Sequence, residues 1–218
     1  MMNFINFFSK KYPLQYGSLL ALTGVLILTP DTLVMRFSNL DKWPLMGWRG
    51  ILMGISLFLI FFIFLKVNFF KEINSLLNWK GFVFIIAFSI NSISFTMGVI
   101  ETSIMVVLTA VATMPVFAAL LSNFFLSEKQ GFVGWITIIA TMLGVYLVVS
   151  DVNNATGHPD GSVFLGAIFG FITAFCLALI FTISKKYPDV SVVPAGAIGS
   201  IISGIVGFSL SREISIDY

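Results

Sequence analysis

The chain has 218 residues, of which 58% are hydrophobic and 10% are charged, and its formal net charge is +2. A soluble domain carries about a quarter charged residues, so this composition predicts a protein of the lipid bilayer. The balance of 12 basic and 10 acidic side chains excludes a nucleic-acid-binding surface, which must be densely basic. A single cysteine, Cys176, excludes an intramolecular disulfide, and a single histidine, His158, argues against a metal site. We therefore expect neither a cofactor nor a metal, and no enzymatic activity.

Apolar segments long enough to cross a membrane recur along the whole chain. A membrane helix needs about 20 mainly apolar residues. Seven segments meet this criterion, at residues 17–35, 45–65, 81–100, 102–126, 131–150, 161–184 and 190–210. The first is expected to remain in the protein, because no small-x-small cleavage site of a signal peptide follows it. The sequence thus predicts an all-α, polytopic helical bundle with seven transmembrane helices.

Basic residues concentrate on one side of the predicted membrane. Eight would lie inside if the N-terminus is cytoplasmic: Lys10, Lys11, Lys66, Lys71, Lys80, Lys129, Lys185 and Lys186. Four would lie outside: Arg36, Lys42, Arg49 and Arg212. Cytoplasmic loops carry an excess of lysine and arginine, so we predict a multi-pass protein of the plasma (inner) membrane with a cytoplasmic N-terminus.

The chain also shows weak internal similarity. A Gly-Ser pair opens both the first and the sixth span, and Arg36 and Pro44 recur at the spacing of Lys186 and Pro194. The second copy begins five spans after the first, an odd number, so it is expected to enter the membrane from the opposite side. This predicts an inverted-topology repeat, in which many secondary transporters hold their substrate near the midplane.

Small residues at helical spacing mark several of the predicted spans. They are Gly50 and Gly54 in the second span, Gly134, Thr137, Thr141 and Gly144 in the fifth, Gly166, Gly170 and Thr173 in the sixth, and Gly196, Ser200, Ser203 and Gly207 in the seventh. Such residues let the backbones of membrane helices approach closely. We interpret them as helix-packing faces; the alternative is that they are the sliding surfaces of a rocking transporter.

The third span is rich in polar side chains, namely Ser89, Asn91, Ser92, Ser94 and Thr96. Unsatisfied polar groups are costly in lipid, so we expect this band to face protein or a wet cavity. Two roles are open for this band: it lines a substrate site, or it forms hydrogen bonds between helices. Asn91 is the strongest candidate for substrate contact, because its amide both donates and accepts hydrogen bonds. The candidate substrate-binding residues are Asn91, Ser92, Thr96, Thr109 and Thr113.

The fourth span places Thr102, Thr109 and Thr113 on one helical face, close to Pro115. A proline inside a helix removes one backbone donor and bends the helix. Pro115 is therefore expected to form either a static kink or a gating hinge, and Pro30 in the first span is the second candidate of this kind.

Charged side chains occur at the outer ends of the spans. Asp31 and Arg49 lie within the first two spans, and Glu101 closes the hairpin between the third and fourth. Charges in a membrane indicate a functional site by default, although snorkelling relieves those near the interface. We predict an ion pair between Asp31 and Arg49, with a proton-coupling role as the alternative.

Residues 102–151 carry several motifs in a fixed order. These are a Thr-Ser pair at the hairpin, a mid-span proline before an apolar run, a Leu-x-Glu at the inner end and a closing glycine, at Thr102 and Ser103, Pro115 with Val116–Leu121, Leu126–Glu128 and Gly144. With Pro30 and Arg49, they resemble the EamA-type transporters of the drug/metabolite transporter superfamily, strongly over residues 17–150 and more loosely over 161–211. The resemblance implies gradient-driven alternating access that exports a small metabolite, such as an amino acid or related organic solute.

The resemblance also implies a five-plus-five arrangement of helices, of which this sequence offers five plus two. The expected parts are a cytoplasmic segment (1–16), the first repeat (17–150), an extracytoplasmic linker (151–160), a partial second repeat (161–211) and a tail (212–218). A fragment, a natural short form and a variant completed by self-association all remain open. The alternative function is a non-transporting scaffold or an inactive remnant. The expected partners are a small solute and lipid, without nucleic acid.

Overall fold

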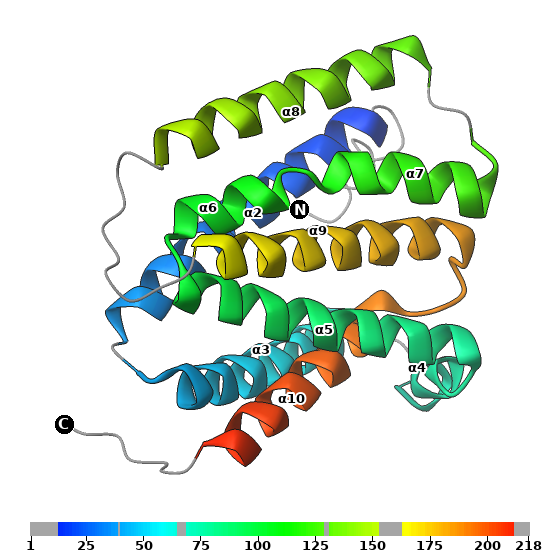
Figure 1. Cartoon of the computed structure of the whole chain (residues 1–218). Coiled ribbons are helices and arrows are strands. Elements are labelled where there is room, and N and C mark those ends of the chain that lie inside the picture. The colour runs from blue at the N-terminus through cyan, green and yellow to red at the C-terminus, as the bar shows by residue number, and fades with distance from the viewer. Residues whose placement is uncertain (1–12, 39, 65–68, 129–130, 153–162, 212–218) are drawn as a thin grey trace. The chain divides into compact units, whose positions relative to one another are not determined.

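The computed structural model describes residues 13–38, 40–64, 69–128, 131–152 and 163–211. All regular structure within these ranges is helical, which confirms the predicted all-α class (Figure 1). The helices are α2 (Pro13–Phe37), α3 (Lys42–Phe64), α4 (Phe69–Leu76), α5 (Trp79–Glu101), α6 (Ile104–Val111), α7 (Met114–Leu126), α8 (Phe132–Val152), α9 (Val163–Lys186) and α10 (Val192–Leu210). The chain divides into two units, Met1–Asn39 with α2 and Leu40–Tyr218 with α3 to α10.

Five candidate membrane spans emerge among the described residues. They are Lys42–Ile63, Trp79–Glu101, Ile104–Leu126, Val163–Lys186 and Val192–Leu210. These coincide with five of the seven expected segments. The other two expected segments form α2 and most of α8, and α8 contains a shorter apolar stretch at Gly134–Gly144. The count of seven transmembrane helices therefore stays a prediction.

The first unit consists of α2. Thr23 donates its hydroxyl proton to the Leu19 carbonyl at 2.8 Å, so this polar side chain is satisfied within its own helix. Leu19, Leu22 and Leu26 are exposed, as expected for a helix whose apolar side chains face lipid. Pro30 lies inside α2 and is itself exposed.

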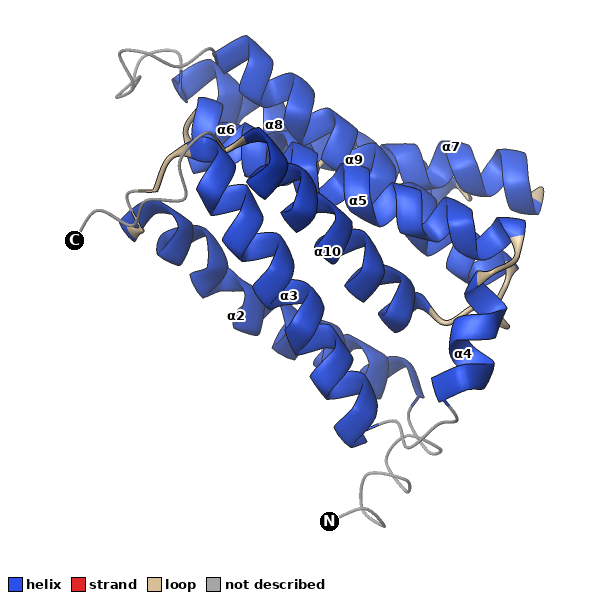
Figure 2. Cartoon of the chain, turned by 90° about the horizontal axis from the view of Figure 1, so that it is seen from below, coloured by secondary structure: helices blue, strands red, loops and turns tan. Residues whose placement is uncertain are grey.

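In the second unit, α3 and α10 run antiparallel in close contact (Figure 2). A Cβ atom on Gly50 would lie 2.5 Å from the backbone nitrogen of Gly204, and one on Gly207 would lie 2.5 Å from that of Gly47. Real Cβ atoms do not approach other atoms this closely, so glycine is required on both helices. The seam therefore brings backbone against backbone, as small residues permit in membrane helices.

The contacts along this seam repeat with a constant offset. A Cβ on Gly54 would meet the Ile201 side chain and the Ala197 carbonyl oxygen. An offset of 150 residues relates Gly54 to Gly204, Ile201 to Ile51 and Ala197 to Gly47. A Cβ on Gly204 would meet the Ile51 side chain and the Gly47 carbonyl oxygen, so the same contacts recur with the two helices exchanged. The contacts of α3 with α10 are thus reciprocal under this offset.

A second antiparallel pair is formed by α5 and α9, side by side in both overall views (Figures 1 and 2). Near one end, Phe84 and Ala87 share a hydrophobic cluster with Ile180 and Ile183. Near the other end, a Cβ on Gly98 would lie 3.3 Å from the Cβ of Phe169. The start of α5 therefore lies at the same end of the unit as the end of α9.

The expected fourth span is interrupted near its middle. α6 ends at Val111, Ala112 and Thr113 form a turn, and α7 begins at Met114. Pro115 lies in the first turn of α7, where a missing N–H removes no helical hydrogen bond. The ring of a proline clashes with the backbone of the turn before it, so that turn cannot be a regular helical one. Two helices therefore replace the single continuous helix expected over 102–126. The connector after α3 likewise contains a short helix, α4, that the sequence analysis did not predict.

Candidate functional site

A hydrogen-bond network joins α5 to α10 in the interior of the second unit. The hydroxyl oxygens of Ser92 and Ser203 lie 2.7 Å apart. Ser203 donates its proton to the Ser200 carbonyl at 2.9 Å, so Ser92 must be the donor to Ser203. The exposed fractions of Ser92 and Ser203 are 5% and 0%. Ser92 is therefore engaged with protein rather than with lipid.

Arg49 extends this network to α3. Its Nη1 atom donates to Thr96 Oγ1 at 3.3 Å, and its guanidinium carbon lies 5.2 Å from the centroid of the Phe95 ring. Thr96 in turn donates to the Ser92 carbonyl at 2.9 Å. A cation over an aromatic face is stabilised by the ring quadrupole. A positive charge is thus held against α5 within the candidate membrane span Lys42–Ile63.

Asn91 lies one helical turn before Phe95. Its Oδ1 atom is buried and has no hydrogen-bond partner, alone in this respect among the side chains that the structure describes. Asn91 shares a helical face with Ala87 and Gly98, both of which lie at the α5–α9 contact. A buried acceptor without a donor is expensive, above all in a membrane. The arrangement can therefore accept a hydrogen bond from water or from a bound molecule.

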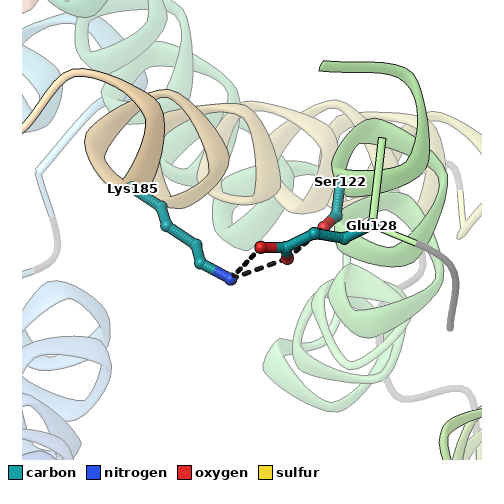
Figure 3. A network of polar contacts seen from close by, with 3 residues as sticks. All are labelled: Ser122, Glu128 and Lys185. Atoms are coloured by element: carbon teal, nitrogen blue, oxygen red, sulfur yellow. Dashed lines mark hydrogen bonds and ion pairs between the residues drawn. The ribbon is translucent and has the colours of Figure 1, made fainter. Parts of the chain in front are cut away.

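A cleft of about 460 Å³ opens between α7, α8 and α9. Pro115 and Ser122 from α7, Thr137 from α8 and Thr182 from α9 contribute to its lining. Glu128 and Lys185 also line the cleft, and the Lys185 ammonium donates to both oxygens of Glu128, at 2.8 and 2.6 Å (Figure 3). The cleft is otherwise mostly apolar, and this ion pair is its charged part.

The backbone after α7 positions Glu128. Ser127 adopts the left-handed conformation, with φ 55° and ψ 25°. This turns the chain back, so that the Glu128 N–H donates to the Ser122 carbonyl at 3.4 Å while the Ser122 hydroxyl donates to Glu128 Oε2 at 3.2 Å (Figure 3). The hydrogen bond from Lys185 is the largest cause that lowers the pKa of Glu128 below its ordinary value of 4.5.

Comparison with known proteins identifies the family. A model described as the EamA-like transporter family matches residues 15–150, well over half of the chain. The chain belongs to the EamA-like transporter family. Neither a curated protein nor a solved structure matches the chain. The expected resemblance is confirmed, and the molecule is a multi-pass membrane transporter of the drug/metabolite transporter type, a family of transporters rather than enzymes.

This EamA-like transporter does not bring all five candidate substrate-binding residues into one network. Thr109 donates to the Met105 carbonyl at 2.6 Å and Thr113 to the Ala110 carbonyl at 2.7 Å, so both buried hydroxyl protons are used within the α6 region. No hydrogen bond among the described residues joins them to Asn91. Ser92 and Thr96 belong to the α3–α5–α10 network, and a substrate contact by any of the five stays a prediction.

The remaining predicted residues have varied surroundings. Gly166 lies against the Thr102 side chain, and a Cβ on Gly170 would lie 2.5 Å from the Ala110 Cβ. Gly134 lines the cleft of α7, α8 and α9. A Cβ on Gly144 would have no described atom within 4 Å, so no packing contact requires glycine there.

The charged residues at the predicted outer ends of the first two spans lie in different parts of the transporter. Asp31 belongs to the first unit and Arg49 to the second, and their ion pair stays a prediction. Sequence reasoning included Glu128 in a motif but missed its partner Lys185. Both residues fall at predicted cytoplasmic ends of spans, which was the available signal, but several other charged residues share that location. His158 lies outside the described residues.

Proposed function

We propose that this EamA-like transporter exports a small polar metabolite, such as an amino acid or related organic solute, and that Asn91 contacts the solute. The buried, unpartnered Oδ1 of Asn91 is the observation that supports this proposal. Leaving such an acceptor unsatisfied costs about 1–3 kcal/mol. An N–H or O–H group of the solute removes this penalty on binding.

Arg49 supplies the complementary charge for such a solute. A guanidinium group binds a carboxylate through two parallel hydrogen bonds. Arg49 lies over the ring of Phe95, which is four positions after Asn91 on α5. The Cβ atoms of two residues at this spacing on a helix are about 6 Å apart. A solute that carries an ammonium and a carboxylate group therefore matches an acceptor at Asn91 and a cation at Arg49.

Alternating access is part of this proposal and rests on an inverted repeat. The antiparallel course of α3 and α10 and the constant offset of their contacts support it, because equivalent helices of inverted repeats run in opposite directions. The first copy would comprise residues 17–150, and residues 161–211 would form the beginning of the second copy. The N-terminus would be cytoplasmic, the membrane the plasma membrane, and the driving force a solute or ion gradient.

A non-transporting scaffold is the second candidate function. It is favoured by the observation that Ser92 and Thr96 hydrogen-bond to protein groups and join three helices. In that case the polar band of α5 would serve only to associate helices. Water access to Asn91 separates the two functions, because a scaffold needs none.

The first experiment measures this access. Asn91→Cys in a Cys176→Ala background would be treated with a charged, membrane-impermeant thiol reagent. Ile90→Cys in the same background is the matched control, because Ile90 is the neighbouring residue on α5 and its side chain is exposed on the apolar surface. Labelling at position 91 and not at 90 supports a solute site. Equal protection of both positions contradicts it.

The second experiment measures transport. Cells that express the wild-type chain and Asn91→Ala would be preloaded with labelled amino acids, and their efflux compared with that of Ile90→Ala. The proposal requires efflux above background for the wild type, a loss of at least about fivefold for Asn91→Ala and little change for Ile90→Ala, since one buried hydrogen bond corresponds to roughly 1–3 kcal/mol. Absence of efflux from well-folded wild type would favour the scaffold.

A further inference from the structure

Two lysines share one aromatic ring at the end of the second unit where α5 begins and α9 ends. The Nζ atom of Lys80 lies 4.2 Å from the centroid of the Tyr187 ring, and that of Lys186 lies 5.7 Å from it. Lys186 also lies 5.5 Å from the centroid of Phe125. Both ammonium groups are exposed and are brought together by the antiparallel course of α5 and α9.

Carboxylates do not neutralise this pair within the described residues. Glu128 binds Lys185, Glu72 accepts a hydrogen bond from Ser191, and Asp189, two residues after Tyr187, forms no ion pair with a described lysine. Neither Lys80 nor Lys186 has a described ion-pair partner. Two like charges beside one ring repel each other, and an anion between them converts this repulsion into attraction.

The position of the pair along the helices indicates which anion is available. Lys80 is the second residue of one candidate membrane span and Lys186 the last residue of another, so both lie where hydrocarbon gives way to headgroups. Beside Lys80, Trp79 is 77% exposed and Leu77 is 80% exposed. Exposed tryptophan next to lysine at the end of a span is typical of the membrane–water interface. At this depth the bilayer presents phosphate groups.

We propose that Lys80 and Lys186, which both lie over the Tyr187 ring, together bind the phosphate of an anionic phospholipid. The two ammonium groups contact the phosphate oxygens. The exposed Trp79 ring, next to Lys80 at the start of α5, accommodates the beginning of an acyl chain. This site does not depend on the proposed solute or on transport.

The test uses the full chain in detergent micelles, with phosphatidylglycerol as the probe and phosphatidylcholine of identical acyl chains as the reference. Lipid retention is measured by native mass spectrometry. Each lysine near the headgroups contributes roughly fivefold to binding of an anionic lipid. The double variant Lys80→Gln/Lys186→Gln is expected to reduce the preference for phosphatidylglycerol by tenfold or more.

Lys42→Gln is the matched control, because Lys42 also lies over an aromatic ring, with its Nζ atom 5.4 Å from the centroid of Trp43. Lys42 begins α3, at the opposite end of the second unit from Lys80. Lys80→Arg/Lys186→Arg keeps both charges and should retain the preference, which separates loss of the site from loss of folding. An unchanged preference in the glutamine variant overturns the proposal, as does an equal loss in Lys42→Gln. Displacement of the lipid by millimolar inorganic phosphate also overturns it, since the site would then take a free anion.

Discussion

Ser92 on α5 donates a hydrogen bond to Ser203 on α10 at 2.7 Å, and the Ser203 hydroxyl donates in turn to the Ser200 carbonyl. Apolar side chains give membrane helices little reason to associate, because lipid tails are equally apolar. The pair therefore provides a directional link between α5 and α10, next to the Thr96–Arg49 contact that links α5 to α3.

Replacing Ser203 is expected to weaken this link. Hydrogen bonds between membrane helices contribute about 0.6 kcal/mol on average and up to about 1.7 kcal/mol. Ser203→Ala should lower the free energy of unfolding by about 1 kcal/mol, as measured by denaturant unfolding in micelles. Ser209→Ala is the control, because Ser209 is exposed on the same helix and bonds only to the Ile205 carbonyl. Equal stability of the two variants would show that the Ser92–Ser203 bond contributes nothing.

Adding a methyl group at Gly50 should force α3 and α10 apart. The new Cβ would lie 2.5 Å from the Gly204 nitrogen and 2.6 Å from the Ser200 carbonyl oxygen, both backbone atoms that have little freedom to move. We expect Gly50→Ala to reduce the free energy of unfolding by about 1–3 kcal/mol. Gly144→Ala has open space and should be neutral or slightly stabilising, since alanine has the higher helix propensity. Thermal unfolding of both variants checks this, and a stable Gly50→Ala would refute the close contact.

The ion pair of Glu128 and Lys185 should persist in mildly acidic solution. Lys185 lowers the pKa of Glu128 below 4.5, so the pair's contribution to stability is fully present above the unfolded value and is lost as the pH falls through the lower, folded value. A ¹³C carboxyl titration, with Glu128→Gln to assign the signal, should give a midpoint below 4.5. Lys185→Gln should raise that midpoint. A midpoint unaffected by Lys185→Gln would contradict the pairing.

Pro115 is expected to be necessary for transport rather than for folding. Pro115→Ala restores a backbone donor and permits α6 to continue into α7 across Ala112 and Thr113. If the break is a hinge, efflux falls severalfold while the unfolding temperature is unchanged or rises. Pro44→Ala, in the first turn of α3, is the control and should leave both quantities unchanged. Unimpaired efflux in Pro115→Ala would establish a static kink.

Sequence reasoning predicted the helices well where long apolar runs define them. It failed at α4, because eight residues with several polar side chains are too short for the length criterion of a membrane span. The disruptive effect of Pro115 was predicted, but not that two separate helices would result. The polar face of Ser92 and Thr96 was expected to meet either protein or a wet cavity. Which of the two it meets, and that the partners are Ser203 and Arg49, depends on how distant helices pack. The pairing of Lys185 with Glu128 could not be predicted from sequence either. Several lysines lie at the same predicted end of the spans, and the sequence does not distinguish which of them meets Glu128.

The glycine seam between α3 and α10 restricts how this transporter changes shape. Where Gly47 and Gly50 meet Gly204 and Gly207, main-chain atoms of the two helices touch without intervening side chains that could rearrange. Displacing one helix along the other would drive carbonyl oxygens into neighbouring backbones. We therefore expect the two helices to move as a single rigid body in any rearrangement of the bundle, with the displacement taken up at its other interfaces.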